Sequence, residues 1–323
     1  MQIIDSLLGN LMVPTIMFFV LGLVAAVVRS DLSIPEGAAK FMSLYLLLAI
    51  GFKGGHSLAE HGLDAALFAA LAAGLVLSLA IPFIAYALLR SLTRLDALNA
   101  AAVAGHYGSI SIVTFVAASS LLDLTGIAAD GYMVAVAATM EVPAILSALW
   151  IAHRFGQPGK TGGVPLRELF ANGSIVLLTG AFVIGALTQD KGMQMIAPFV
   201  VTPFTGILCL FLLDMGLSAG RSLLRNRHML SAGLFGFGLL MPVVGALLAW
   251  GCGTLIGLQT GSLFLLMVLA ASASYIAVPA AMKIALPQAE SGIYLTLSLG
   301  VTFPFNITLG LPLYLWLAGL GAA

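Results

Sequence analysis

Two apolar segments of the chain are interrupted by residues that could bind a small anion. The first carries Gly105-His106-Tyr107-Gly108-Ser109-Ile110-Ser111, and the second carries Ala271-Ser272-Ala273-Ser274-Tyr275 with Pro279 after it. Hydroxyls donate hydrogen bonds, small residues let a solute approach the backbone, and a helix that starts at such a break presents unpaired N–H groups. In lipid, a break of this kind must face protein or a watery cavity. We therefore predict an anion site formed by Gly108, Ser109, Ile110, Ser111, Ser272, Ala273, Ser274 and Tyr275.

A second group of residues could hold a cation beside that anion. Glu141 lies well inside an apolar segment, where burying a carboxylate costs at least a few kcal/mol, and Pro143 beside it frees a backbone carbonyl. The predicted sodium ligands are Glu141, Asn306, Thr302, Ser109 and Thr114. Structural readings stay open. A protonated Glu141 or Asn306 could bond a neighbouring helix, and small residues at the breaks could simply let helices pack closely.

The composition indicates that membrane helices position these residues. Of 323 residues, 61% are hydrophobic and 8% are charged, and the mean hydropathy is +1.11, whereas soluble domains carry about 25% charged residues. A spanning helix needs roughly 20 mostly apolar residues. Ten segments qualify, although the second is short enough to lie partly in the interface: about 11–28, 38–52, 64–89, 97–121, 131–152, 173–189, 196–215, 230–257, 261–284 and 291–317. We expect an all-α polytopic membrane protein with ten transmembrane helices.

The basic residues predict the orientation of these segments. If the N-terminus is outside, the inside loops hold Arg29, Lys40, Arg90, Arg94, Arg154, Lys160, Arg167, Arg221, Arg225, Arg227 and Lys283, and the outside loops hold Lys53 and Lys191. Such a bias agrees with the positive-inside rule, so both termini should be outside. No basic stretch or small-residue cleavage site precedes the first apolar segment, which argues against a removable signal peptide.

Matches between the two halves of the chain suggest an internal repeat. At an offset of about 165 residues, Gly51, Gly55, Ser57 and Leu58 match Gly216, Gly220, Ser222 and Leu223, while Ser109 matches Ser274 and Glu141 matches Asn306. Five segments is an odd number, so the second half must enter the membrane inverted, as in many secondary transporters. We predict repeats at 1–155 and 173–323, joined by an inside loop at 156–172, with the fourth and ninth segments as broken, crossing helices.

Other polar residues receive structural interpretations. Asp214 is read as a solvated acid at a helix end, and His106 as an interhelical hydrogen-bond partner rather than a pH sensor. An outer cluster is read as a solvated loop or short surface helix rather than a metal site: Lys53, His56, Glu60, His61 and Asp64. Arg221, Arg225, Arg227 and His228 form an inner basic patch, which sets orientation or docks a soluble partner.

Several function classes find no support in the sequence. The chain has no Gly-x-Ser-x-Gly elbow, no His-Glu-x-x-His and no nucleotide-binding loop, so we expect neither an enzyme nor a self-contained pump. An intramembrane protease would need a second catalytic group facing Glu141, and the sequence offers none, so we do not expect this activity. Cys209 and Cys252 are read as small buried hydrophobes. We expect no cofactor and no nucleic-acid partner.

The segments quoted above resemble a known family. Gly105 to Phe115 resembles the first signature of the sodium-dependent bicarbonate permeases of the SbtA type, and Ala271 to Ala281 and Leu299 to Asn306 resemble the second and third. Met140-Glu141-Val142-Pro143 looks like the acid–apolar–proline element of that family. The resemblance covers nearly the whole chain. Two departures are a short central loop and Glu141, where the cyanobacterial members have aspartate.

The resemblance implies a transporter of the bacterial plasma (inner) membrane. It implies two inverted repeats, a core (transport) domain that moves against a scaffold (gate) domain in an elevator-like mechanism, and a homotrimer. It also implies bicarbonate uptake coupled to sodium, with a PII-like soluble regulator in cyanobacterial members. Cation coupling is physically sensible. Moving one negative charge inward against an inside-negative membrane potential costs roughly 2.3 kcal/mol per 100 mV, and one sodium ion that moves in with the anion cancels this cost. The alternatives are a symporter of another small anion and a non-transporting receptor or assembly subunit.

Overall fold

The described part of the chain is helical. The computed structural model describes residues 13–61, 64–155 and 173–321, and these ranges form helices and connecting turns with no strand. Eight helical stretches are long and apolar enough to cross a membrane, and Pro14–Val27 and Thr260–Ala271 are shorter apolar helices. The predicted all-α class is therefore confirmed, and the lengths and composition of these helices are consistent with a polytopic membrane protein.

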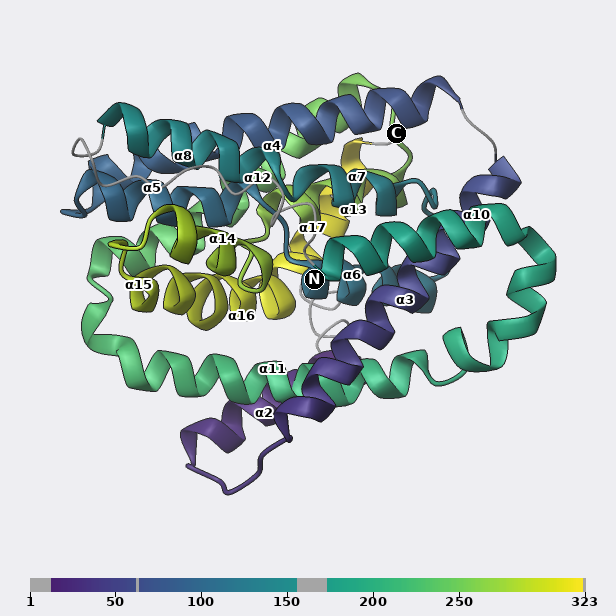
Figure 1. Ribbon diagram of the computed structural model, residues 1–323, viewed down its shortest axis with the longest axis horizontal. Helices are drawn as coiled ribbons and strands as arrows, with labels where there is room; N and C mark the ends of the chain where they lie inside the picture. Colours follow the sequence, from purple (N-terminus) through teal and green to yellow (C-terminus); the bar gives the residue numbers. More distant parts are fainter. Residues whose placement is uncertain (1–12, 62–63, 156–172, 322–323) are drawn as a thin grey trace.

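The helices follow one another with short connections (Figure 1). The first half contains α2 (Pro14–Val27), α3 (Glu36–His61), α4 (Ala65–Leu92), α5 (Ala97–Gly108), α6 (Ile112–Thr125), α7 (Met133–Met140) and α8 (Pro143–Phe155). The second half contains α10 (Gly173–Val200), α11 (Phe204–Asn226), a 3₁₀ turn (Arg227–Met229), α12 (Ala232–Leu255), α13 (Thr260–Ala271) and α14 (Ala277–Ala285). The last stretch is α15 (Ser291–Leu295), α16 (Phe303–Phe305) and α17 (Leu311–Gly321), joined by π-helical turns at Thr296–Thr302 and Asn306–Gly310.

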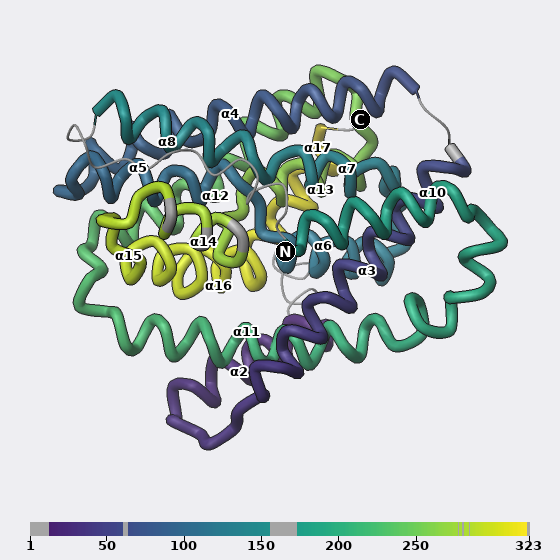
Figure 2. The backbone as a smooth tube through the Cα atoms, viewed as in Figure 1, coloured from purple at the N-terminus to yellow at the C-terminus, as the bar shows by residue number. Residues whose placement is uncertain are grey.

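The helices pack as two groups, which we call the frame and the core. The frame consists of α2, α3, α10 and α11, in which α3 packs along α10 and α11 packs along α2. The core consists of α4 to α8 and α12 to α17. Figure 2 shows α11 and α2 running along one edge of the molecule, with α3 and α10 connecting that edge to the core. Each group contains segments from both halves of the chain.

Glycines make the close helix contacts of the frame possible. A Cβ atom on Gly55 of α3 would lie 1.8 Å from the Phe182 carbonyl oxygen of α10. A Cβ atom on Gly216 of α11 would lie 2.2 Å from the Phe19 carbonyl oxygen of α2. Since a real Cβ atom cannot approach a backbone oxygen so closely, these pairs of helices depend on glycine where they cross.

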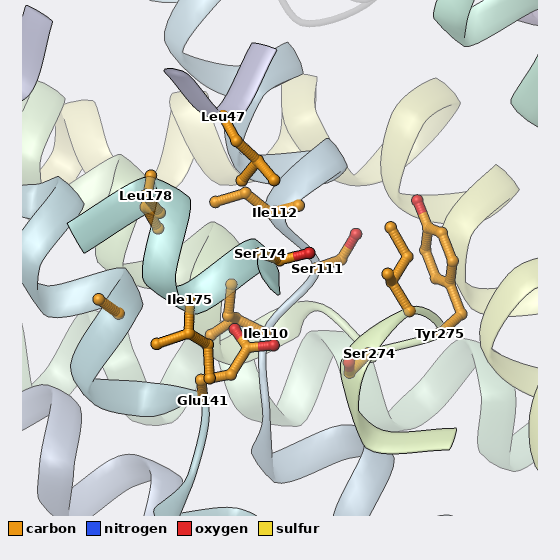
Figure 3. Close-up of a pocket in the computed structure, with 12 residues that line it drawn as sticks. Leu47, Ile110, Ser111, Ile112, Glu141, Ser174, Ile175, Leu178, Ser274 and Tyr275 are labelled. Atoms are coloured by element: carbon orange, nitrogen blue, oxygen red, sulfur yellow. The ribbon is translucent and has the colours of Figure 1, made fainter. Parts of the chain in front are cut away.

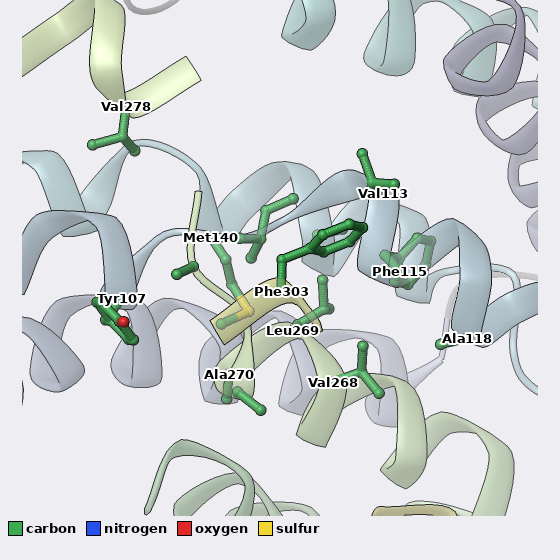
Figure 4. Close-up of a cluster of buried hydrophobic side chains, with 14 of the residues drawn as sticks. Tyr107, Val113, Phe115, Ala118, Met140, Val268, Leu269, Ala270, Val278 and Phe303 are labelled. Atoms are coloured by element: carbon green, nitrogen blue, oxygen red, sulfur yellow. The ribbon is translucent and has the colours of Figure 1, made fainter. Parts of the chain in front are cut away.

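The core is filled by apolar side chains from helices of both halves. In Figure 4, Val113 and Phe115 of α6 lie with Leu269 of α13 and Phe303 of α16 in one buried cluster.

Asp96 begins α5 by accepting hydrogen bonds from the Leu98 and Asn99 backbone N–H groups. Partial burial raises the pKa of the Asp96 carboxyl, but these hydrogen bonds and one from the Asn99 side chain outweigh it, so the pKa lies below its usual range.

The second predicted segment, 38–52, is too short, and the interpretation of the outer cluster is wrong in part. Helix α3 continues to His61, so Lys53, His56 and Glu60 lie on a long helix rather than in a solvated loop or short surface helix. His56 Nε2 lies 2.9 Å from Asp190 Oδ1 of α10. Glycines and polar residues favour a helix end in an isolated sequence, but here close packing against α10 outweighs that propensity.

The boundary between the sixth and seventh predicted segments is right at residue 189 and wrong at residue 196. The helical conformation is interrupted at Gln189 (φ 50°, ψ −144°), where the sixth segment was expected to end, but α10 resumes after this kink and continues to Val200, and α11 begins only at Phe204. Asp214 therefore lies in the middle of α11 and is not at a helix end. The polar residues at 188–191 thus mark a real interruption, and a second turn, which contains Pro203, precedes Phe204. The predicted loop 156–172, with Lys160 and Arg167, lies outside the described residues.

We expect Gly55→Ala to destabilise the protein. The added methyl group would collide with a backbone carbonyl that cannot rotate away, and overpacking of this kind costs about 1–3 kcal/mol. The measurement is thermal unfolding of the purified protein in detergent. Gly180→Ala in α10 is the matched control, because a Cβ atom at Gly180 meets nothing within 4 Å. Equal transition temperatures for the two variants would contradict the packing described here.

Candidate functional site

The first break separates α5 from α6. Helix α5 ends at Gly108, where a Cβ atom would lie 2.4 Å from the Pro82 ring, and Ser109 follows with extended backbone (φ −86°, ψ 179°). Ser111 then caps α6, since its Oγ accepts hydrogen bonds from the Thr114 backbone N–H (3.3 Å) and the Thr114 hydroxyl (2.9 Å). The segment Ser109-Ile110-Ser111 is thus a short extended link between two half-helices.

The second break separates α13 from α14. Helix α13 ends at Ala271, and Ser272 is extended (φ −87°, ψ 164°). Helix α14 begins at Ala277, and the Val278 backbone N–H donates a long hydrogen bond to Ser274 Oγ at 3.4 Å. Both interruptions predicted from the sequence are present.

The two breaks lie side by side and satisfy each other's backbone groups. The Ser111 backbone N–H donates to Ser272 Oγ at 2.8 Å, and the Ser274 backbone N–H donates to the His106 carbonyl oxygen at 2.8 Å. Buried backbone groups that leave a helix must find partners, and here each break supplies partners for the other. The prediction that the interrupted segments meet is therefore confirmed.

A small cavity opens where the breaks meet the frame (Figure 3). Its volume is about 20 Å³, about the space that one water molecule needs. The core contributes Ile110, Ser111, Ile112, Ala138, Glu141, Ser274, Tyr275 and Ile276, and the frame contributes Leu47 of α3 with Ser174, Ile175 and Leu178 of α10. None of these residues is basic. The cavity therefore lies at the boundary between the core and the frame.

The hydrogen bonds divide the four predicted anion-binding serines into two pairs. The Ser109 hydroxyl donates to the Glu141 carbonyl oxygen (3.2 Å), and the Ser272 hydroxyl donates to the Leu269 carbonyl oxygen (2.9 Å). Ser111 and Ser274 accept hydrogen bonds, and neither hydroxyl donates to another described residue. These two also line the cavity. Ser109 and Ser272 hold the breaks in place, whereas Ser111 and Ser274 have hydroxyl protons for a solute.

Glu141 brings a carboxylate to the same cavity. It occupies the interruption between α7 and α8, its side chain lines the cavity, and the residue is 8% exposed. The carboxylate forms no ion pair or hydrogen bond with another described residue. Its position is fixed through the backbone, because Ser78 donates to the Met140 carbonyl oxygen (2.7 Å) and Ser109 donates to that of Glu141. A buried carboxylate without a partner is suited to bind a cation.

Tyr275 is the aromatic wall of the cavity. Its ring packs edge-on against Phe303, with centroids 5.2 Å apart. Its hydroxyl is buried and makes no hydrogen bond of normal geometry with a described residue, although Ser111 lies nearby. The neighbouring Ala273 is buried and does not line the cavity, and neither does Gly108.

The predicted cation ligands are not all brought together. Asn306 donates to the Ala271 carbonyl oxygen (2.9 Å) and accepts from the Tyr314 hydroxyl (2.9 Å), so it caps the end of α13. The Thr302 hydroxyl is bonded to Tyr107 (2.6 Å) and to the Gly238 carbonyl oxygen (2.7 Å). Neither residue lines the cavity with Glu141. Thr114 is connected to the cavity through Ser111, and Ser109 through the Glu141 carbonyl.

His106 does not make the interhelical hydrogen bond expected from the sequence. Its Nδ1 lies 2.7 Å from the Ala102 carbonyl oxygen of the same helix, and the contact with another helix is a stacked ring pair with Tyr294, centroids 4.3 Å apart. Its Nε2 is buried with no partner among the described residues. At the helix breaks, His106 contributes its backbone carbonyl, which accepts the hydrogen bond from the Ser274 N–H.

Sequence reasoning missed Ser78 and the frame residues Leu47, Ser174, Ile175 and Leu178. Ser78 gave a usable signal, since it precedes Pro82 by four residues in an apolar segment. Proline frees a carbonyl at that spacing, and polar residues beside it in a membrane helix often support an interruption. The frame residues are ordinary apolar or small residues with no such signal.

Comparison with known protein families identifies a match that spans nearly the whole chain. The family model described as the Na⁺-dependent bicarbonate transporter superfamily matches residues 14–319. No curated protein matches the chain.

We expect Ser272→Ala to lower stability more than Ser274→Ala. The first substitution leaves the buried Ser111 backbone N–H without an acceptor, which costs about 1–3 kcal/mol, whereas the second removes only a long hydrogen bond. Unfolding temperatures of the two variants in the same detergent give the comparison. A larger drop in unfolding temperature for Ser274→Ala would contradict the assignment of Ser272 to holding the breaks and of Ser274 to contact with a solute.

Proposed function

The chain belongs to the Na⁺-dependent bicarbonate transporter superfamily, and from this premise we propose that it imports bicarbonate together with sodium. The observation that carries the proposal is the cavity at the helix breaks. It combines the Ser111 and Ser274 hydroxyls with the carboxylate of Glu141, and no basic residue in the described part of the chain lines it. These groups favour an anion and a cation in adjacent positions.

The charges explain why the two ions should bind together. An anion held by Ser111 and Ser274 shares a small cavity with the Glu141 carboxylate, and two like charges at this range repel strongly in a low-dielectric interior. A sodium ion between them removes the repulsion. It also offsets the roughly 2.3 kcal/mol per 100 mV that the membrane potential imposes on one inward-moving negative charge.

The frame and the core are proposed to act as the scaffold and transport domains of an elevator-like mechanism. The cavity is closed on one side by frame residues Leu47, Ile175 and Leu178, so displacement of the core along the frame would uncover it. Polar contacts across this boundary include Lys53 with Asp123 and Asn226 with Thr296. Much of the remaining boundary near the cavity is apolar, which permits sliding.

We also propose that the two halves are inverted repeats, residues 1–155 and 173–323. The paired glycines provide support: Gly51 and Gly55 contact α10 from α3, and their matches Gly216 and Gly220 contact α2 from α11. The second helix of one half thus packs on the first helix of the other half, in both directions. Ten spans with both termini outside follow from this arrangement and from the distribution of basic residues.

The proposal extends to assembly and location. A bacterial inner-membrane homotrimer is supported by α10, whose exposed residues include Val183, Leu187 and Met195 and are available for lipid or a second subunit. Arg225 and Arg227 are exposed at the end of α11 and provide a surface for a PII-like soluble regulator.

The proposal is tested by uptake of labelled bicarbonate into proteoliposomes. We expect uptake driven by an inward sodium gradient, a loss of at least tenfold in the double variant Ser111→Ala/Ser274→Ala, and loss of sodium dependence in Glu141→Gln. Ser218→Ala in α11, far along the chain from both breaks, is the matched control and should transport normally.

Other outcomes of this experiment identify the alternatives. Sodium-driven uptake of a different small anion in preference to bicarbonate would make the chain a related symporter. Bicarbonate binding without flux would indicate a receptor or assembly subunit built on the same fold. Sodium-independent uptake would contradict the coupling assigned to Glu141.

A further inference from the structure

A second cavity lies at the opposite end of α6 from the helix breaks. Helix α6 is about 20 Å long, and its first residues line the small cavity while Ser119, Leu122 and Asp123 near its end line a cavity of about 280 Å³. The wall opposite α6 is again α3, with Ile50, Lys53 and Ser57. Under the proposed orientation this end is outside, and we call the larger cavity the vestibule.

The two cavities are adjacent along the boundary between α3 and α6. Leu47 of α3 lines the small cavity, and Ile50, one helical turn further, lines the vestibule. A solute that moves from the vestibule to the helix breaks therefore passes along the face that α3 shares with α6. This is the boundary at which the core would slide against the frame.

Lys53 is the one basic residue among the described residues that line either cavity. Its ammonium group lies 3.1 Å from Asp123 Oδ2 and 5.3 Å from the centre of the Phe204 ring. The side chains of Lys53 and Asp123 are 34% and 63% exposed. An ion pair this exposed contributes little free energy, so another anion can replace the Asp123 carboxylate at modest cost.

The other acid of the vestibule is already engaged. Ser262 donates from its hydroxyl to Asp130 Oδ2 at 2.6 Å, and the Asp130 backbone N–H donates to Ser262 Oγ at 2.9 Å. These bonds hold Asp130 on α13, and the structure shows no contact between Asp130 and Lys53. Asp123 is therefore the direct competitor for the Lys53 ammonium group.

We propose that Lys53 forms a docking subsite for the transported anion, a small oxyanion of the bicarbonate class, which displaces the Asp123 carboxylate before it reaches the helix breaks. The inference rests on the proposed function for the identity of the anion. The vestibule also carries Asp123 and Asp130, so Lys53 would act by direct contact between its ammonium group and the anion rather than through the net charge of the vestibule. The subsite accelerates loading and takes no part in sodium binding.

The uptake assay separates docking from a merely structural ion pair, because the two predict different signs. If Lys53 docks the anion, Lys53→Met lowers kcat/KM for bicarbonate by about tenfold with kcat unchanged, while Asp123→Asn raises kcat/KM. Lys53→Arg should retain most of the wild-type value. If the pair only joins α3 to α6, Lys53→Met and Asp123→Asn impair uptake equally, and the proposal is overturned.

Asp130→Asn controls for the general effect of removing a negative charge from the vestibule. It removes the same charge as Asp123→Asn, but from a carboxylate that does not contact Lys53. We expect Asp130→Asn to leave kcat/KM within about twofold of wild type. If Asp130→Asn raised kcat/KM as much as Asp123→Asn does, the increase would come from the lower negative charge of the whole vestibule rather than from release of Lys53. That result would overturn the proposed subsite.

A chemical readout tests the subsite without transport, so that its failure and the failure of the proposed function are distinguishable. Purified protein in sodium-free buffer at fixed pH is treated with an amine-reactive reagent, and modification of Lys53 is followed by mass spectrometry. We expect bicarbonate to slow modification of Lys53 more than chloride at equal ionic strength, and more in Asp123→Asn than in wild type. Equal rates in the two salts would overturn the subsite whether or not the protein transports bicarbonate.

Discussion

The structure depends on a rule of the membrane interior, that a polypeptide leaving a helix must find partners for its backbone groups. The two breaks meet this rule through each other, by the hydrogen bonds from the Ser111 N–H to Ser272 Oγ and from the Ser274 N–H to the His106 carbonyl. Side chains complete the arrangement at Ser109 and Ser78. The same bonds that stabilise the crossing determine which hydroxyls remain to contact a solute.

A second constraint is electrical. The cavity offers hydroxyl donors and one carboxylate, and its described lining, within 13–61, 64–155 and 173–321, includes no lysine or arginine. In the proposed function, an ionised Glu141 would repel an anion bound here unless a cation accompanies it. We therefore propose that the position of this one acid couples the two ions. In the same proposal, the basic residue that an incoming anion contacts first is Lys53, in the vestibule at the far end of α6.

Local features of the sequence predicted the chemically important parts well. Serine, glycine and proline in apolar segments are costly, so their presence at 105–111 and 271–279 indicated interruptions, and the structure contains them. The third interruption, between Met140 and Pro143, lies inside a segment that was expected to be one helix. The predicted end of α3 was wrong, because glycines and charged residues suggested a loop after residue 52, whereas packing against α10 extends the helix to His61. The predicted start of α11 was wrong because the residues from 196 are mostly apolar and hid the turn before Phe204. Asn306 looked like a sodium ligand by its repeat position, yet Tyr314 and the end of α13 occupy its amide. The frame side of the cavity was not predictable, because Leu47, Ile175 and Leu178 acquire their role only through packing of segments far apart in the chain.

The central claim is that the cavity at the crossing of the broken helices holds an anion and a cation together. The most direct measurement is a high-resolution cryo-electron microscopy map of the protein in lipid nanodiscs, recorded with sodium bicarbonate and with a matched salt that contains neither ion. The account predicts planar density between Ser111 and Ser274 and a separate spherical density at the Glu141 carboxylate, both absent from the control. Ordered ions elsewhere, with this cavity unchanged between the two maps, would contradict it.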